Sequence, residues 1–260
     1  MPGGMIDMES NTTLVQCYPA HEAYPDGAGP FPALLLFHDK FGLTSDFRGT
    51  ANRLAREGFY TLAPNFYAVC ASFADVAPEF MRTAGPSGFG PADESSADSF
   101  ATGLTDDRAA AVIAQALAYV AGRSHARGGG VGVLGFSMGG RLALRAACLH
   151  PDAIRACVAF TPERLTRARS AGQPAVLDDV DRLRAPVLIL YGGLDENVRA
   201  AEREAVRARL ADLGKDVTVE VFREAPHDFM FGDRETYRVG PSKRAWSATL
   251  AFLRQALEKG

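Results

Sequence analysis

Residues 131–144 read Val-Gly-Val-Leu-Gly-Phe-Ser-Met-Gly-Gly-Arg-Leu-Ala-Leu: an apolar run, a serine between glycines, and a helical pattern. Within this stretch, residues 135–139 have the form G-x-S-x-G. A strand, a tight turn and a helix in this order are the setting of a nucleophile elbow, in which the serine hydroxyl is exposed on a strained backbone. The glycines keep side chains out of the crowded strand and helix backbones. The stretch predicts an α/β protein with Ser137 as its candidate nucleophile.

The rest of the chain alternates between strand and helix patterns. Continuous apolar runs are typical of strands that are covered on both faces, and periodic stripes are typical of amphipathic helices. The strands are expected at 12–18, 31–37, 59–63, 131–134, 154–160, 186–191 and 217–222, and the helices at 45–58, 106–122, 140–147, 202–213 and 242–259. This alternation predicts a mostly parallel, twisted sheet with helices on both faces. Ligands of such sheets bind beyond the carboxyl ends of the strands.

We expect one main domain. Residues 1–28 form an N-terminal segment with a possible edge strand, and residues 29–260 form a single α/β domain. A stretch at about 68–104 is rich in Gly, Pro, Ser and Asp, and is predicted to be a long loop with short helical pieces. Long loops in compact domains often act as lids, although a simple insertion explains the composition equally well.

Composition narrows the class of partner. The chain has 260 residues, 47% of them hydrophobic, and a formal net charge of -3. Because it has no basic block, a nucleic-acid partner is not expected, and no apolar run approaches the ~20 residues of a membrane span. No signal peptide is visible and the four cysteines are scattered, so we expect a cytoplasmic protein that uses no metal or cofactor. We expect the partner to be a small molecule. The composition leaves open whether the protein is a monomer or a homodimer.

A base and an acid follow Ser137 in the order expected of an α/β-hydrolase. A serine hydroxyl needs a base to remove its proton, and the base needs a carboxylate to orient it. Asp195 comes directly after the strand at 186–191, and His227 comes after the strand at 217–222. Glu196 and Asp228 are the rival acids. Order and local context predict the triad Ser137, Asp195 and His227.

An acyl-transfer site also needs donors for an oxyanion. We expect one to be the backbone N–H of Met138, the residue after the nucleophile. The other should come from the loop after the strand at 31–37, with the Lys40 N–H preferred and the Phe41 N–H second. His38 lies in the same loop, but His227 follows the acid and is the better base, so His38 is expected to be structural.

With these residues in place, the chain resembles the dienelactone hydrolase family of α/β-hydrolases. The stretches that carry the resemblance are HDKFGLTSDFRGTANRLAREGFYTLAPNFYA, VGVLGFSMGGRLAL, PVLILYGGLDENV and APHDFMF, and the resemblance spans residues 30–258. It implies an ester or lactone hydrolase.

The family pattern also differs from this chain at informative positions. Family enzymes use a cysteine where this chain has Ser137, and a glutamate where it has Asp39. Asp39 could therefore order its loop or bind near Ser137. The family's substrate-binding arginine, four residues after the histidine, is replaced by Phe231, which favours a less anionic acyl group. Arg82 could supply another basic contact.

Phe41, Phe66, Tyr67 and Phe231 are candidate walls of the acyl pocket, and a core role for Phe66 explains the sequence equally well. The leading hypothesis is a serine esterase or lactonase. An amidase, peptidase or thioesterase on the same fold, and a member that binds a metabolite without hydrolysis, are the alternatives.

Overall fold

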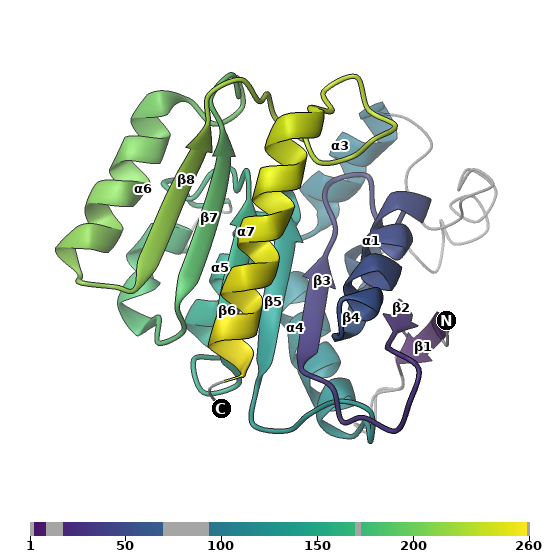
Figure 1. The fold of residues 1–260 in the computed structure, drawn as a ribbon. Helices are drawn as coiled ribbons and strands as arrows, with labels where there is room; N and C mark the ends of the chain where they lie inside the picture. Colours follow the sequence, from purple (N-terminus) through teal and green to yellow (C-terminus); the bar gives the residue numbers. More distant parts are fainter. Residues whose placement is uncertain (1–2, 9–17, 70–93, 170–172, 259–260) are drawn as a thin grey trace. The chain divides into compact units, whose positions relative to one another are not determined.

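The computed structural model describes residues 3–8, 18–69, 94–169 and 173–258. The chain divides into two compact units, Met1–Gly129 and Gly130–Gly260. Each unit contains its own set of neighbouring strands and the helices that cover them (Figure 1).

The first unit contains four neighbouring strands in the order β1-β2-β4-β3. β3 and β4 run parallel, whereas β2 is antiparallel to both β4 and β1. The elements are β1 (Gly3–Met8), β2 (Tyr18–Ala23), β3 (Ala33–Phe37), α1 (Ser45–Arg56), β4 (Tyr60–Pro64), the 3-10 helix η1 (Phe66–Val69), α3 (Glu94–Gly103) and α4 (Asp106–Ala121).

Burial explains why these segments fold as they do. Every residue of β3 and β4 is buried, as the continuous apolar runs predict. The apolar stripe of α1 (Phe47, Ala51, Leu54 and Ala55) is buried, and this helix packs on β2 and β4. Gly58 follows the helix with φ +99°, a conformation that glycine adopts without strain. Thr105 caps α4 by accepting the Arg108 N–H, at 3.3 Å.

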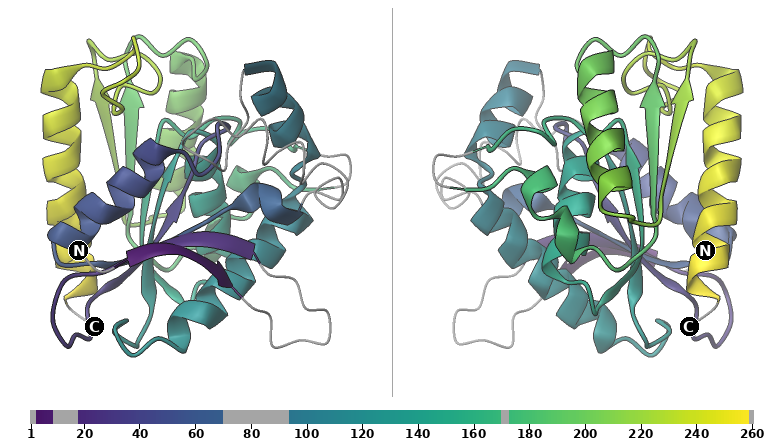
Figure 2. Two further views of the ribbon diagram at one scale, coloured as in Figure 1. Left: turned by 90° about the vertical axis from the view of Figure 1, so that its right-hand side faces the viewer. Right: turned by 90° about the vertical axis from the view of Figure 1, so that its left-hand side faces the viewer.

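The second unit holds four parallel strands in the order β5-β6-β7-β8. α5 contacts β5 and β6 on one face, and α7 contacts β5, β6 and β7 on the other, as Figure 1 shows. α6 and α7 lie on opposite sides of β7 and β8 (Figure 2, right). The elements are β5 (Val131–Phe136), α5 (Met138–Leu149), β6 (Ile154–Phe160), the 3-10 helices η2 (Val176–Asp178) and η3 (Val180–Arg182), β7 (Val187–Gly192), α6 (Ala200–Asp212), β8 (Val217–Phe222) and α7 (Val239–Leu257).

The predicted fold class is confirmed, with local differences in the elements. The predicted strand at 12–18 falls largely outside the described residues, and β2 begins at its last residue, Tyr18. β1 was not expected, because the first 25 residues carry no clear pattern. α7 starts three residues before the predicted Ser242, since Pro241 is tolerated in the first turn of a helix. Of the long loop at 68–104, residues 94–103 form α3 and residues 70–93 lie outside the described part of the chain.

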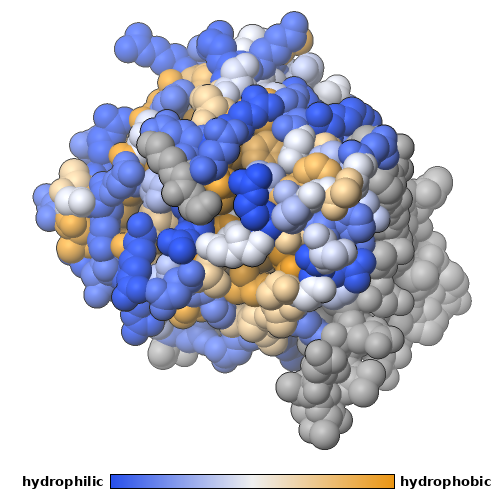
Figure 3. Space-filling model, turned by 60° about the horizontal axis from the view of Figure 1, so that its bottom comes forward, coloured by the Kyte–Doolittle hydropathy of each residue, from blue (hydrophilic) through white to orange (hydrophobic). Residues whose placement is uncertain are grey.

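The surface mixes hydrophilic and hydrophobic residues. In the view of Figure 3, hydrophilic residues cover much of the face, with smaller hydrophobic areas between them. Among the described residues, no helix combines the length and the apolar character that crossing a membrane requires.

α5 is buried along almost its whole length, and one of its buried side chains is the charged Arg145. Arg145 is 5% exposed, and its Nη1 lies 2.7 Å from Asp179 Oδ2. Its Nη2 donates to the Pro174 carbonyl at 3.3 Å. A buried guanidinium costs several kcal/mol when it has no compensating carboxylate, so Asp179 ties the η2–η3 segment to α5.

Asp179→Ala is expected to lower the free energy of unfolding by about 3 kcal/mol, because it leaves Arg145 buried without its carboxylate. Urea denaturation measures the change. Asp152→Ala is the matched control: it removes an ion pair with Arg184 whose two side chains are 84% and 68% exposed. The control should change the free energy by no more than about 0.5 kcal/mol. Equal effects of the two substitutions would contradict the assignment.

Candidate active site

The turn between β5 and α5 holds Ser137 in a strained conformation. Its φ is 51° and its ψ is -112°, outside the regions that side-chain-bearing residues normally occupy. The turn is tight enough that a Cβ at Gly135 would lie 2.0 Å from the Gly139 carbonyl oxygen, so only glycine fits there. The Ser137 N–H donates to the Phe160 carbonyl at 2.8 Å, which fixes the turn to the neighbouring strand β6.

Asp195 is built into the loop after β7 as a buried hydrogen-bond acceptor. Its Oδ1 accepts the backbone N–H groups of Asn197 at 2.9 Å and Val198 at 3.0 Å. Arg203 braces the same loop by donating to the Val198 carbonyl at 2.6 Å. These bonds leave Oδ2 directed at His227, with the Asp195 side chain fully buried.

His227 connects the acid with the serine. Its Nδ1 lies 2.8 Å from Asp195 Oδ2, and its Nε2 lies 2.9 Å from Ser137 Oγ. A carboxylate can only accept, so Nδ1 carries the proton and Nε2 accepts the serine hydroxyl. Burial lowers the pKa of His227, but the hydrogen bond with Asp195 and the nearby negative charges raise it more, so the pKa lies above its ordinary value of 6.5. The ring is thus a base aimed at the serine proton.

The loops that carry acid and base approach each other through two glycines. A Cβ at Gly192 would lie 2.4 Å from the carbonyl oxygens of Ala225 and Pro226, and one at Gly193 would lie 2.6 Å from Arg223 Cα. Backbone hydrogen bonds from Gly193 to Phe222 and from Leu194 to Ala225 join the two loops. This close contact puts Asp195 and His227 within hydrogen-bond distance, although they come from different strands.

Neither rival acid contacts His227 Nδ1 in the way that Asp195 does. Glu196 is exposed. Asp228 approaches the other ring nitrogen, with its Oδ1 3.7 Å from His227 Nε2, and it has a positive φ of 54°. Only Asp195 bonds to Nδ1, so the arrangement has one orienting acid on one side of the imidazole and a second carboxylate on the other.

Aromatic side chains support the serine and histidine loops from beneath. Phe136 stacks on Phe160 with ring centroids 4.6 Å apart, and Phe231 lies 5.1 Å from Phe136. Phe229, two residues after His227, lies 5.4 Å from Phe222. Phe231 is 5% exposed and is part of this aromatic cluster.

In the first unit, the loop after β3 is held by hydrogen bonds within the loop and by hydrogen bonds to η1. The Asp39 carboxylate accepts the Phe41 N–H at 2.8 Å, and the Tyr67 hydroxyl donates to the Lys40 carbonyl at 2.6 Å. His38 donates from Nδ1 to the Asp39 carbonyl at 2.7 Å, and its Nε2 accepts the Phe66 N–H at 3.0 Å. Burial lowers the pKa of His38 to about 4, so the ring stays neutral, which fits the expected structural role.

The side chains of Lys40 and Phe66 make contacts of other kinds, and a third predicted residue, Arg82, is not among the described residues. The Lys40 ammonium pairs with Asp98 at 3.0 Å and lies 5.4 Å from the centre of the Phe41 ring. Phe66 is fully buried and contacts Phe37 edge to face, 4.9 Å between ring centroids, as a core residue would. Arg82 lies outside the described residues.

Sequence reasoning missed several supports of this site. Gly192 and Gly193 could have been found, because a double glycine just before a candidate acid suggests close backbone approach. Arg203 and Arg234 have no such signal, since arginines on helices and loops are common at surfaces.

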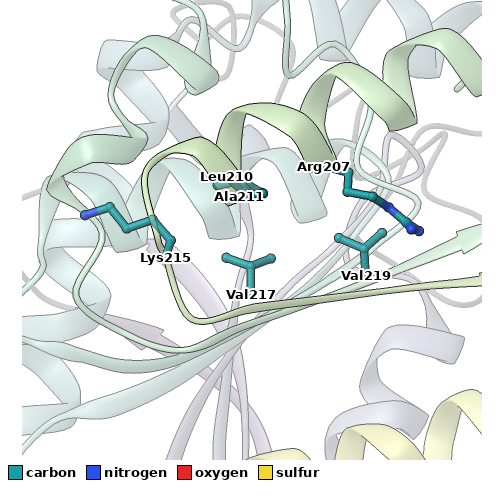
Figure 4. A pocket seen from close by; sticks show the side chains of 6 residues that line it. All are labelled: Arg207, Leu210, Ala211, Lys215, Val217 and Val219. Carbon is teal, nitrogen blue, oxygen red and sulfur yellow. The ribbon is translucent and has the colours of Figure 1, made fainter.

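A groove of about 190 Å³ lies away from these residues, between α6 and β8 (Figure 4). It is lined by Arg207, Leu210, Ala211, Lys215, Val217 and Val219. The Lys215 ammonium donates to the carbonyl oxygens of Asp181 and Leu183, so its charge serves the fold. No residue of the serine, acid or histidine loops lines this groove.

The strand order and elbow geometry define an α/β-hydrolase. Comparison with known proteins gives the family: the sequence matches the dienelactone hydrolase family over residues 19–257, and the chain belongs to it. A protein of Methylorubrum extorquens named "Putative carboxymethylenebutenolidase" is 29% identical over 244 residues, 91% of this chain and 76% of that protein. "Protein usf" of Aquifex pyrophilus is 27% identical and covers 98% of this chain and 99% of its own length.

The fold is shared with a solved structure. A crystal structure described as a "Putative Dienelactone Hydrolase" from Klebsiella pneumoniae aligns with a TM-score of 0.84 at 25% identity, and covers 98% of both chains. Membership of this family indicates a hydrolase.

Gly192→Ala is expected to destabilise the protein by about 2 kcal/mol, because the new methyl group meets two carbonyl oxygens that cannot move independently. The substitution should also weaken the hydrogen bond between Asp195 and His227, which the chemical shift of the His227 Nδ1 proton reports. Gly232→Ala is the control, since a Cβ there meets nothing within 4 Å. A Gly192→Ala protein as stable as this control would rule out the close approach.

Proposed function

We propose that this protein is a serine hydrolase that cleaves a carboxylic ester or lactone through an acyl-enzyme. The observation that carries the proposal is the continuous hydrogen-bonded chain Asp195–His227–Ser137, with distances of 2.8 and 2.9 Å. The strained turn at Ser137 supports it, since backbone strain is found where the surrounding structure must hold a functional side chain in place.

The reaction follows from the direction of these hydrogen bonds. Ser137 Oγ attacks the carbonyl carbon while its proton moves to His227 Nε2, and Asp195 stabilises the imidazolium that forms. The imidazolium then returns the proton to the leaving alcohol oxygen as the carbon–oxygen bond breaks. A water molecule activated by the same ring attacks the acyl carbon and releases Ser137.

We propose the backbone N–H groups of Met138 and Lys40 as the oxyanion donors. Met138 is the first residue of α5, where N–H groups point along the helix axis and the helix dipole favours negative charge. Lys40 is preferred to Phe41 because the Phe41 N–H already donates to Asp39. In this proposal Asp39 orders the loop that presents the Lys40 N–H, and Tyr67 fixes the next peptide by donating to the Lys40 carbonyl.

The substrate class is inferred from what the chain lacks. The relative in Methylorubrum extorquens carries the name "Putative carboxymethylenebutenolidase". In this chain, phenylalanine at position 231 provides no planar donor pair for a substrate carboxylate. We therefore propose an acyl group without a negative charge, with Phe41 and Tyr67 as candidate contacts and Arg82 as a candidate contact that lies outside the described residues.

We further propose a cytoplasmic protein that acts as a monomer or homodimer on a small molecule. The two cysteines of the described residues, Cys148 and Cys157, are free and buried, as suits a reducing compartment.

Ser137→Ala should lower the turnover of p-nitrophenyl acetate by at least about a thousandfold, because no other hydroxyl takes the place of the nucleophile. The wild-type enzyme should bind a fluorophosphonate covalently at Ser137, as peptide mass spectrometry reports. Retained hydrolysis in the variant would overturn the proposal. Matched ester, lactone, thioester and amide substrates separate an esterase or lactonase from a thioesterase or amidase, and complete lack of labelling would favour a non-hydrolytic member.

Tyr67→Phe should lower kcat about three- to tenfold with little change in KM, because it releases the Lys40 carbonyl and loosens a donor that acts mainly in the transition state. Steady-state kinetics on the same ester measure it. Tyr24→Phe is the control, since the Tyr24 ring stacks on Tyr60 and His125, away from this loop. A rise in KM at unchanged kcat would instead assign Tyr67 to substrate binding.

A further inference from the structure

Asp228 occupies an unusual position for a carboxylate. It follows His227 directly. Its backbone has a φ of 54°, a conformation that costs an L-residue free energy and persists only where surrounding contacts hold it. The loop does enforce it: the Thr236 hydroxyl donates to the Asp228 carbonyl at 3.2 Å. This conformation turns the Asp228 side chain back toward the histidine ring.

The two carboxylate oxygens of Asp228 have different surroundings. Oδ2 lies 3.0 Å from Arg234 Nη1. Oδ1 is buried, has no hydrogen-bond partner among the described residues, and lies 3.7 Å from His227 Nε2. A distance of 3.7 Å is too long for a hydrogen bond, yet the interaction with a charged imidazole is strong in a site shielded from water.

Arg234 is itself held in place. Its guanidinium lies 4.4 Å from the centre of the Phe231 ring, and its side chain is 17% exposed. The phenylalanine that replaces the family's arginine thus serves as a platform for a different arginine, three residues further along. That arginine is paired with Asp228 and partly offsets its charge.

We propose that Asp228 is a second carboxylate for His227, moderated by Arg234, that stabilises the imidazolium formed when Ser137 attacks. Asp195 faces Nδ1 and Asp228 faces Nε2, so the ring is charged between two carboxylates. The serine proton moves to Nε2 and later leaves to the alcohol oxygen, and Asp228 exchanges no proton. Asp228 is a positioning residue that acts through His227, and this inference rests on the proposed function.

Other charges act on the same ring. Within this unit, Asp195, Asp228 and Glu163 all favour its protonated form, and burial opposes them. Because the base must be neutral to accept the serine proton, the acid limb of kcat/KM should lie above pH 6.5, the value of an ordinary imidazole. Removing a negative charge should move this limb to lower pH, and removing a positive charge should move it to higher pH.

The test uses paired substitutions in the full-length protein. Asp228→Asn keeps the shape and tolerates the positive φ, and removes only the charge. We expect the acid limb of p-nitrophenyl acetate hydrolysis to shift to lower pH, and kcat on the plateau to fall roughly three- to tenfold. Arg234→Gln should shift the limb to higher pH, and the double variant should return it close to the wild-type position. Asp233→Asn, an exposed aspartate of the same loop, should leave the profile unchanged.

Nuclear magnetic resonance separates this inference from the proposed function. Titration of the His227 ring nitrogens in wild type, Asp228→Asn and Arg234→Gln measures the pKa of the ring without any substrate. This pKa should fall in Asp228→Asn and rise in Arg234→Gln. If the ring pKa shifts as expected but no ester is hydrolysed, the electrostatic coupling stands and the hydrolase proposal fails. An unshifted His227 in Asp228→Asn, or shifts of the same sign in both variants, would overturn the role of Asp228. If Asp228→Asn does not fold, the pKa of His227 in Arg234→Gln decides. A rise in this pKa supports the role of Asp228, and no change or a fall contradicts it.

Discussion

The backbone turn at Ser137 is the constraint on which the second unit depends. A residue that carries a side chain is stable at a φ of 51° only if the segments on both sides of it are fixed. Here a buried strand precedes the turn and a buried helix follows it. The absence of a Cβ at Gly135 lets helix and strand meet. The parallel strands beside β5 then bring the ends of β7 and β8 to the same edge, where acid and base are needed.

Each of the two carboxylates near the imidazole of His227 uses its two oxygens for different contacts. Asp195 uses one carboxylate oxygen to bind its own loop and the other to bind the ring. Asp228 divides its oxygens in the same way, between Arg234 and the ring. Because each carboxylate is anchored at one end, its other oxygen keeps a fixed direction toward the ring of His227.

Replacement of single residues within the family pattern has wider structural consequences. Phe231 joins the aromatic cluster under the serine loop and supports Arg234 from one face of its ring. In the first unit, aspartate at position 39 is short enough to bind the N–H two residues ahead, a turn that this side chain commonly makes. Both side chains therefore make their contacts within the protein itself.

The sequence alone determined the alternation of most strands and helices, the turn at Ser137 and the candidate partners that follow the later strands. These features are local or periodic: apolar runs mark buried strands, and residues just after parallel strands must share an edge. Only the tertiary structure decided which carboxylate faces which nitrogen of His227. That choice depends on loop backbones held together by Gly192 and Gly193, on the positive φ of Asp228 and on its pairing with Arg234, and none of these contacts leaves a periodic trace in the sequence.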